Sequence, residues 1–367
     1  MEILITGANG LLGRHVIAVL QRRGDAVRAL VLPGEDTTWL EEHRVAIFPG
    51  DVRRRETLVE PMRGAEAVLN LAGMMGLWRS FQDYDDVNVK GLEHVCREAL
   101  RAGVRRLVHI SSWRVYGSGP WGLYASGART PHREDAPLRP FPEPYSVTKA
   151  KGERVVRRLI ADEGLPAVIL RPGTFFGPGD QLHFGHLADR LRSGVSLVIG
   201  SGRNALPFVY VTDVAQGVVL ALDAENAVGQ TYNITSDEVM TQEELLRAVA
   251  EEIGAKPPTI HVPYSVLYAA AFAAEHVAMI PGYRGNPVVT RMGVTLFGAD
   301  NRHSIEKARA ELGYAPRVGL REGVRLAGAW YREQRNIAVD HGGGGTIPQR
   351  VELASANPRY GSGCEKS

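Results

Sequence analysis

A tyrosine and a lysine four residues apart carry the clearest catalytic chemistry in this chain. Tyr145 and Lys149 stand in the run YSVTK. On a helix, that spacing places both side chains on one face, one turn apart. A free phenol titrates near about pH 10, whereas a lysine cation close by favours the phenolate and lowers that pKa. The pair therefore predicts proton transfer by the phenol, provided that a cofactor and a group that polarises the substrate lie beside it.

Two adjacent serines are candidates for the polarising group. Ser111 and Ser112 directly follow the apolar run Arg106–Ile110, which is typical of a buried strand. A serine hydroxyl at the end of that strand can donate to a carbonyl or hydroxyl oxygen of a substrate beside Tyr145. The sequence leaves open that these serines close a turn or cap a helix instead.

A glycine-rich run opens the chain. TGANGLLG, Thr6–Gly13, follows the apolar stretch Met1–Ile5 and precedes a helical pattern, so it predicts strand, glycine turn and helix. Glycines at positions 7, 10 and 13 suit the close approach of the backbone to a pyrophosphate at the positive end of a helix. An ordinary tight turn is the alternative, and the downstream YSVTK run favours the dinucleotide site.

Short apolar runs alternate with helical segments over the first half of the chain. The spacing of Leu92, Val95 and Leu100 is typical of such a helical segment. The alternation predicts an α/β fold, a doubly wound parallel (Rossmann) sheet with the cofactor across the carboxyl ends of its strands. The expected strands are Ile3–Ile5, Val27–Leu32, Val45–Phe48, Ala67–Leu71, Arg106–Ile110 and Ala167–Leu170.

The pattern changes after about Arg171, where turns rich in glycine and proline alternate with short helices. Phe208–Val211 and Gln230–Ile234 are expected to be strands that return to the sheet, and Asp213 is expected to cap a helix over Val214–Leu222. A smaller C-terminal substrate-binding domain is therefore predicted to be interleaved with the first. The expected division is residues 1–171 plus about 207–234 for NAD(P), 172–206 plus 235–335 for the substrate, and 336–367 as a flexible tail.

Composition narrows the class of partner. The 43 basic and 41 acidic residues nearly balance, which argues against a nucleic-acid partner. Cys96 and Cys364 alone give no disulfide framework and fit a reducing compartment. The first residues form a strand rather than a signal peptide, so we expect a cytoplasmic protein. His183 and His186 lack matching cysteine or acidic neighbours, so no metal site is expected.

The stretch Val262–Ile280 is almost wholly apolar. Glu275 and His276 interrupt it, which favours a buried or surface-docked helix over a transmembrane span. Contact of this helix with a membrane surface stays open.

Over residues 1–335 the chain resembles the extended short-chain dehydrogenase/reductases. The motifs that carry the resemblance, in order, are TGANGLLG, GDV at 50–52, NLAG at 70–73, VNVKG at 87–91, SSWRVYG at 111–117, YSVTK and RPGTFFGPGD. The resemblance implies hydride transfer between the nicotinamide of NAD or NADP and a carbinol or ketone carbon of a small-molecule substrate. It also implies a homodimer.

The resemblance implies a role for each matching residue. Ser112, Tyr145 and Lys149 match the catalytic triad, and Asn88 matches the asparagine that completes a proton-relay tetrad. Ser112 is chosen over Ser111 because the family serine lies four residues before the tyrosine of VYG, here Tyr116. The cofactor-binding set is Gly7, Asn9, Gly10, Leu11, Leu12, Gly13, Asp51, Val52, Leu71, Ala72, Gly73, Lys149, Pro172 and Gly173. The substrate set is Trp113, Tyr116, Thr174 and Phe175.

The sequence leaves the choice between NAD and NADP open. Val31 stands where an acid usually binds the ribose 2′-hydroxyl, and Leu32 stands where an arginine often meets a 2′-phosphate. Glu35 and Asp36 could curl back to that place, which favours NAD, whereas Arg14 could favour a phosphate.

The expected substrate is a large hydrophobic alcohol or ketone. Thr174 replaces the asparagine that grips the diphosphate in relatives that act on nucleotide sugars, and Trp113 and Arg114 replace a dehydratase's acid pair. Trp121 and Tyr124 add apolar surface in the insertion between Ser112 and Tyr145. Together with the apolar stretch and the pattern FGADNRHSIEKARAELGYAPRVGLREGV, these features are most similar to the 3β-hydroxysteroid dehydrogenase-like branch. That likeness implies a sterol, terpenoid, polyketide or β-keto acid derivative.

Two other classes remain. A nucleotide-sugar 4-epimerase or ketoreductase would need a basic clamp, to which Arg171, Arg203 and Arg284 could contribute. A non-catalytic NAD(P)-binding regulator is the other class, against which the intact set of Ser112, Tyr145 and Lys149 argues.

Overall fold

The chain folds around a seven-stranded parallel sheet. The computed structural model describes residues 1–76, 78–117, 130–280 and 286–337. The strand order is β11-β6-β5-β4-β1-β2-β3, which reverses direction between β1 and β4 and so forms the predicted doubly wound sheet. The strands are β1 (Glu2–Thr6), β2 (Ala26–Val31), β3 (Ala46–Pro49), β4 (Ala67–Asn70), β5 (Arg106–Ile110), β6 (Ala167–Pro172) and β11 (Thr231–Ile234).

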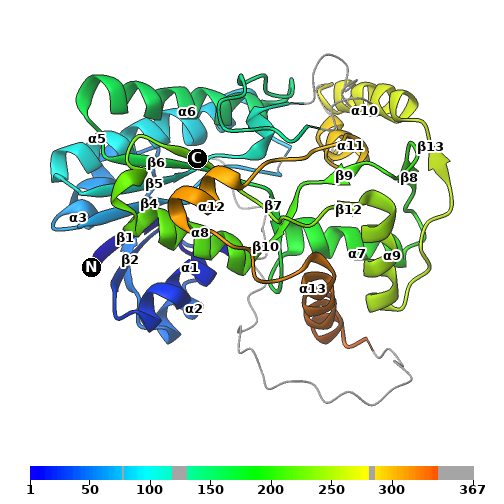
Figure 1. The fold of residues 1–367 in the computed structure, drawn as a ribbon, viewed down its shortest axis with the longest axis horizontal. Coiled ribbons are helices and arrows are strands. Elements are labelled where there is room, and N and C mark those ends of the chain that lie inside the picture. Colours follow the sequence, from blue (N-terminus) through cyan, green and yellow to red (C-terminus); the bar gives the residue numbers. More distant parts are fainter. Residues whose placement is uncertain (77, 118–129, 281–285, 338–367) are drawn as a thin grey trace.

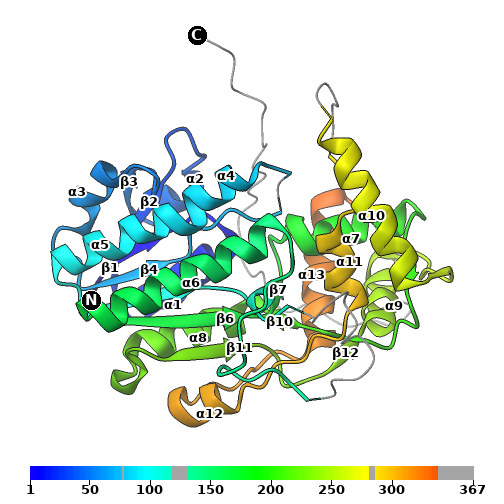
Figure 2. The same cartoon turned by 90° about the horizontal axis from the view of Figure 1, so that it is seen from above.

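Helices cover both faces of this sheet, because successive strand residues point to opposite sides. Ile3 and Ile5 pack with helices α1 (Leu11–Arg22) and α8 (Val211–Asp223) on one face. Leu4 packs on the other face with α5 (Leu92–Ala102) and α6 (Pro144–Glu163), which lie side by side across the sheet (Figure 2). Of the shorter helices, α2 (Thr38–Glu42) packs in the core on the α1 side, and α3 (Val59–Met62) and α4 (Phe81–Asp85) lie on the side of α5 and α6.

A second, smaller lobe lies beside the carboxyl ends of the strands (Figure 1). Its core is rich in aromatic side chains, among them Phe176, Phe208 and Tyr331. Its strands form three pairs: β7 (Thr174–Phe176) with β10 (Phe208–Tyr210), β9 (Ala205–Leu206) with β12 (Met240–Thr241), and β8 (Val198–Ile199) with β13 (His261–Val262). Its helices are α7 (His186–Arg192), α9 (Gln242–Ile253), α10 (Tyr264–Ala278), α11 (Arg291–Gly298) and α13 (Leu320–Arg335).

One expected strand lies elsewhere. We expected Phe208–Val211 to return to the main sheet, but β10 pairs in parallel with β7. The reason is that β11 already occupies the place beside β6. The expected cap is also wrong, because α8 begins at Val211 and Asp213 lies inside its first turn. The Asp213 carboxylate instead accepts hydrogen bonds from the backbone N–H groups of Arg317 (2.9 Å) and Val318 (3.2 Å).

The chain returns to the main sheet once more than expected. Helix α12 (Glu306–Leu312) falls in the range that we assigned to the substrate domain. Its side chains Ala308 and Leu312, with Tyr314 after it, instead pack in the same core as α1 and α8. The two lobes are therefore joined by several crossings, which fixes the position of one against the other.

Most of the apolar stretch Val262–Ile280 forms α10, and this helix is not buried. Only Ala271 and Glu275 of this helix are buried, and it packs mainly against α11. Within the described ranges no helix combines the length and the apolar character that crossing a bilayer requires. Trp121, Tyr124, Arg284 and nearly all of the expected tail lie outside the described residues.

Candidate active site

The glycine turn joins β1 to α1, and it leaves no room for a side chain at two of its positions, Gly7 and Gly13. Gly7 has φ +70°, and a Cβ there would lie 2.8 Å from the backbone nitrogen of Ala72. A Cβ on Gly13 would lie 2.3 Å from the carbonyl oxygen of Ala8. Gly10 precedes α1 and provides no side-chain cap, and the first turn holds no acidic residue. The positive end of α1 is therefore left to bind an anion, as a pyrophosphate site requires.

Polar contacts hold the loop after the glycine turn against the end of β2. Asn9 donates to the backbone oxygen of Asp36 (2.7 Å) and accepts from Arg14 through its side-chain oxygen (2.7 Å). The Arg14 guanidinium lies over the ring of Trp39, 5.3 Å from its centroid. Glu35 folds back so that its carboxyl oxygen accepts from the backbone N–H of Leu32 (3.3 Å). The place where an adenosine ribose would lie is thus flanked by one carboxyl group and one guanidinium.

The next two expected cofactor segments follow β3 and β4. Asp51 is buried, and its carboxylate accepts from the backbone and the guanidinium of Arg53. Val52 is also buried beside it. After β4, the backbone N–H of Ala72 donates to the Thr6 hydroxyl (3.2 Å), which ties this segment to the glycine turn. Because parallel strands end at one edge, all of these segments lie along the same side of the sheet.

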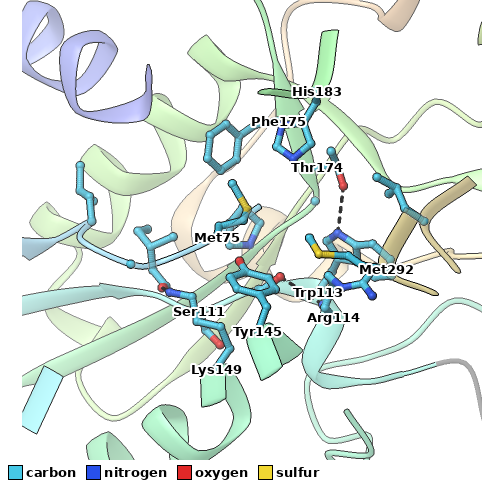
Figure 3. Close-up of a pocket in the computed structure, with 17 residues that line it drawn as sticks. Met75, Ser111, Trp113, Arg114, Tyr145, Lys149, Thr174, Phe175, His183 and Met292 are labelled. Carbon is cyan, nitrogen blue, oxygen red and sulfur yellow. Dashed lines mark hydrogen bonds between the residues drawn. The ribbon is translucent and has the colours of Figure 1, made fainter. Parts of the chain in front are cut away.

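Tyr145 and Lys149 lie in the first two turns of α6. Glu143 caps this helix by accepting from the backbone N–H of Ser146 (3.2 Å), and Pro144 occupies the first turn, where a missing N–H costs nothing. Both catalytic candidates are buried, at 6% and 5% exposure, and point to the same side (Figure 3). The Lys149 ammonium donates to the backbone oxygen of Ile110 at the end of β5 (2.8 Å).

The electrostatics of this pair differ from our expectation. Burial raises the pKa of Tyr145 to about 12, although a hydrogen bond with Ser112 and the charge of Arg114 act in the opposite direction. Burial also lowers the pKa of Lys149 to about 8. We expected the lysine cation to lower the pKa of the phenol. The reason for the difference is that the ammonium bonds to Ile110 and both groups are removed from water.

The two serines after β5 have separate partners. The hydroxyl of Ser111 donates to Glu153 (2.9 Å), deep under α6. The hydroxyl of Ser112 accepts from the backbone N–H of Arg114 (3.2 Å) and is hydrogen-bonded to the phenol of Tyr145. Ser112 therefore caps a short helical turn, as the alternative allowed, and its role toward a substrate oxygen stays a prediction.

Asn88 lies near the pair without touching it. It stands in a π-helical turn over Asp86–Gly91 and is buried. Its side-chain amide bonds to the backbone of Met74 (2.8 and 3.1 Å) and to the Thr148 hydroxyl (3.1 Å). The amide thereby holds the segment after β4 against α6, and the role in a proton relay stays a prediction.

One pocket brings ten of the expected residues together. Ser112, Tyr145 and Lys149 line it with Leu71, Gly73, Trp113, Pro172, Gly173, Thr174 and Phe175 (Figure 3). Trp113 is held by a hydrogen bond from its indole N–H to Thr174 (3.1 Å). Tyr116 does not line the pocket. Its hydroxyl donates to Asn233 (2.7 Å) and accepts from Arg171 (2.6 Å), so the residue is part of a buried network, and the expected substrate contact stays a prediction.

His183, which the sequence suggested as a substrate-loop or surface residue, also lines the pocket. Sequence reasoning did not name several other lining residues as site residues, namely Met75, Ile110, Arg114, Met292 and Leu296. Met75 follows the NLAG motif closely, and Arg114 follows Ser112, so proximity to a motif could have indicated both. Met292 and Leu296 come from α11, which lies far along the chain, and no motif marks them.

Comparisons with known proteins agree with this arrangement. A model of the NAD dependent epimerase/dehydratase family matches residues 3–235. The 3beta-hydroxysteroid-dehydrogenase/decarboxylase isoform 1 of Arabidopsis thaliana is 31% identical over 345 residues, which cover 88% of this chain and 77% of that protein. The 2-alkyl-3-oxoalkanoate reductase of Stenotrophomonas maltophilia is 30% identical over 332 residues, covering 89% and 98%. The crystal structure of gox2253 matches with a TM-score of 0.76 and 31% identity, covering 92% and 99%.

The sheet topology and the family match define an enzyme that binds a nicotinamide dinucleotide on a Rossmann-type domain. The chain belongs to the NAD-dependent epimerase/dehydratase family, the extended short-chain dehydrogenase/reductases, and is an NAD(P)-dependent oxidoreductase.

Proposed function

We propose that the protein interconverts a secondary alcohol and a ketone on a large hydrophobic substrate. The observation that carries this proposal is the pocket itself, where Ser112, Tyr145 and Lys149 face an otherwise largely apolar wall. Leu71, Met75 and Phe175 supply apolar surface from the nucleotide-binding side, and Met292 and Leu296 supply it from α11. Such a wall suits a sterol, a terpenoid, a polyketide or a β-keto acid derivative.

The residues present fit a dinucleotide cofactor. The turn at Gly7 and Gly13 excludes side chains, and the N-terminus of α1 has no side-chain cap. The Rossmann turn would hold the pyrophosphate, Lys149 the ribose hydroxyls, and Pro172 and Gly173 the nicotinamide side of the pocket. When bound, the cofactor supplies or accepts a hydride.

The chain's own residues move the proton. Tyr145 is a neutral phenol at neutral pH, and burial raises its pKa further, to about 12, so it carries the proton that a ketone oxygen receives. Ser112, hydrogen-bonded to that phenol, orients and polarises the same oxygen. Lys149 anchors the arrangement to the end of β5 through Ile110. In the oxidative direction Tyr145 takes the proton back.

We propose that NAD is the preferred cofactor. The Glu35 carboxyl group folds back onto the backbone N–H of Leu32, which brings an acid to the end of β2 although none stands in the strand. An acid at this place binds a ribose 2′-hydroxyl and disfavours a 2′-phosphate. Arg14, the residue that could favour NADP, has its guanidinium bonded to Asn9 and packed on Trp39.

The nucleotide-sugar alternative finds less support. Arg171 is 1% exposed and bonds to Glu153 and Tyr116, so it is not free to clamp a diphosphate. Arg203 is not among the described residues that line the pocket. An epimerase would keep its cofactor and need none added, whereas a dehydrogenase would show a substrate-dependent change in the absorbance of added cofactor.

Replacing the phenol tests the proposal. Tyr145→Phe should lower turnover at least about 10²- to 10⁴-fold, the usual contribution of a general acid, and leave dinucleotide affinity within about 3-fold. The matched control is Tyr210→Phe, because Tyr210 is also buried but lies in the core of the second lobe, away from the pocket. Turnover of the Tyr145→Phe enzyme close to the wild-type value would refute the assignment.

Two further contacts complete the proposal. A homodimer is the assembly that the family resemblance implies, and the mass of the protein in sedimentation tests it.

For α10, we propose contact with a membrane surface, because Val266, Phe272 and Val277 of this helix are exposed. The only acidic residue of the helix, Glu275, is buried in an ion pair with Arg291, so the exposed face carries no carboxylate.

A further inference from the structure

Arg114 carries a buried charge that is only partly satisfied. It lines the pocket two residues after Ser112 and is 3% exposed. Its Nε donates to Glu143 (3.2 Å) and to the hydroxyl of Ser146 (3.1 Å), and its Nη2 donates to Glu143 (3.1 Å) and to Thr295 (3.0 Å). Its Nη1 is buried and has no hydrogen-bond partner.

The unpaired Nη1 of Arg114 differs from the other buried polar atoms of the described pocket wall. Among the described residues that line the pocket, Arg114 alone has a buried side-chain polar atom without a partner. Buried donors are nearly always paired, and the cost of leaving one unpaired is larger for a charged group. Two rings restrict the guanidinium, whose central carbon lies 5.1 Å from the centroid of Trp113 and 4.5 Å from that of Phe141. The vacant donor therefore needs an acceptor that comes to it.

The charge around the pocket indicates what that acceptor is. Arg114 and Lys149 are the cationic groups of its wall, and no aspartate or glutamate is among the described lining residues. Glu143 bonds to the Nε and Nη2 side of the guanidinium. It also caps α6, so the positive end of that helix and the N–H of Ser146 share its charge. Glu143 thus balances charge on one side of the guanidinium, and the unpaired Nη1 on the other side favours an anion.

The acceptor must also lie close to the reacting oxygen. The charge of Arg114 acts on the phenol of Tyr145, and Arg114 donates its backbone N–H to the Ser112 hydroxyl. Figure 3 shows Arg114 beside Trp113, on the same pocket wall as Tyr145. The group that Arg114 binds therefore lies in the same pocket as the carbon that reacts.

We propose that Nη1 of Arg114 binds a substrate carboxylate, so that the substrate is a hydroxy or keto acid with a large apolar chain or ring. This rests on the proposed alcohol–ketone function and selects one of its substrate classes. Arg114 is the residue that determines specificity: it distinguishes the free acid from the ester and from the plain alcohol.

Three matched alcohols test the proposal by turnover. These are β-hydroxytetradecanoic acid, its methyl ester, and the secondary alcohol that lacks the carboxyl group, each assayed with NAD and with NADP. The wild-type kcat/KM should be at least about 10-fold higher for the acid than for the other two, and Arg114→Gln should lower the value for the acid by about 10- to 100-fold more than it lowers the values for the ester and the alcohol. Equal values for acid and ester in the wild type, or equal losses for all three in the variant, would overturn the carboxylate site.

Binding keeps the two proposals apart and does not depend on the folding of a variant. Tetradecanoate and tetradecanamide are titrated into the wild-type protein, with the emission of Trp113 and the other tryptophans as the readout. The acid should bind at least about 10-fold more tightly than the amide. Equal affinities overturn the carboxylate site. Tight binding of the acid without turnover of any of the three alcohols supports the site but overturns the proposed function. Turnover of the ester and the alcohol as fast as that of the acid supports the proposed function but overturns the carboxylate site.

Arg114→Lys is the conservative variant. It keeps the positive charge and loses the planar fork, so it should retain part of the preference for the acid while Arg114→Gln retains none. The same loss of preference in both variants, with unchanged melting temperatures, still supports a geometric role for Nη1. Full retention of the preference for the acid in both variants overturns that role.

Discussion

At the scale of single residues, burial sets the protonation states of the active site. Tyr145 and Lys149 are shifted in opposite directions, the phenol to a pKa of about 12 and the ammonium to about 8. Removal from water disfavours the charged form of each group, which raises one pKa and lowers the other. The site is therefore prepared for the reduction of a ketone at neutral pH, with a protonated phenol and a charged lysine.

Lys149 should set the alkaline limit of activity. Its pKa is lowered to about 8, so its charge is present below that pH and lost above it, while Tyr145 stays protonated throughout the range. We expect kcat/KM for ketone reduction to be level from about pH 6 to 7, to be halved near pH 8, and then to fall, approaching about 10-fold per pH unit. The Lys149→Arg variant keeps its positive charge at high pH. Its kcat/KM should therefore be lower than that of the wild type but level up to pH 10. An unchanged fall in the variant would assign the limit to another group.

Glu35 should set the choice of cofactor. We expect Glu35→Ser to lower the affinity for NAD and to raise that for NADP, changing their ratio by about 10-fold or more, because a carboxyl group at the end of β2 disfavours a 2′-phosphate. Calorimetric titration of both cofactors measures the ratio. Asp36→Ser is the matched control, since the carboxylate of the neighbouring Asp36 bonds to Thr38. A change of similar size in the control would contradict the assignment to Glu35.

At the scale of elements, the ends of strands and the start of one helix position the chemistry. The carboxyl ends of β1, β4, β5 and β6 all lead into residues expected to touch cofactor or substrate. Helix α6 adds Tyr145 and Lys149 from its first two turns. Each functional side chain thus stands within a few residues of a rigid element, which keeps the pocket geometry independent of long loops.

The glycine turn should separate folding from binding. Gly13→Ala would place a Cβ 2.3 Å from Ala8, so we expect a loss of stability, measured as a melting temperature lower by about 4 °C or more. A Cβ on Gly10 meets only the oxygen of Gly7, at 3.3 Å, and faces the open N-terminus of α1. Gly10→Ala should therefore melt within about 2 °C of the wild type yet bind NAD at least about 10-fold more weakly. Unchanged NAD affinity in this variant would place the pyrophosphate elsewhere.

The sequence predicts elements well where a pattern is local. The strands from β1 to β6 and the residues around Ser112, Tyr145 and Lys149 follow from short periodic runs and closely spaced motifs. It predicts less where the outcome depends on long-range competition. β10 leaves the main sheet because β11 holds the neighbouring place, and Tyr116 turns from the pocket because Arg171 and Asn233 are its partners. Neither competitor lies near its target in the sequence.

At the scale of the whole molecule, the active site lies between two lobes that the chain builds together. The first lobe supplies the nucleotide edge of its sheet and, from α6, Tyr145 and Lys149, and α11 of the second lobe supplies Met292 and Leu296. The hydrogen bond from Arg114 to Thr295 links the lobes directly at the pocket. Because α10 packs on α11, its exposed face lies one helix away from the substrate wall.

That face should bring the protein to membranes. Exposed apolar side chains gather on and after α10, with Val266 at 57%, Phe272 at 46% and Ile280 at 57% exposure, and a hydrophobic substrate partitions into the same lipid phase. We expect the full chain to sediment with vesicles of mixed phosphatidylcholine and phosphatidylglycerol. Phe272→Glu should reduce the bound fraction by about 5-fold or more, because it places a charge on the contacting face. Val239→Glu is the matched control, since Val239 is also exposed (58%) but lies before β12, and its binding should equal that of the wild type. Vesicle binding by Phe272→Glu equal to that of the wild type would contradict the membrane contact and would show that α10 stays in water. If the wild type does not bind vesicles and Phe272→Glu loses the mass of a dimer, α10 contacts a second copy of the chain.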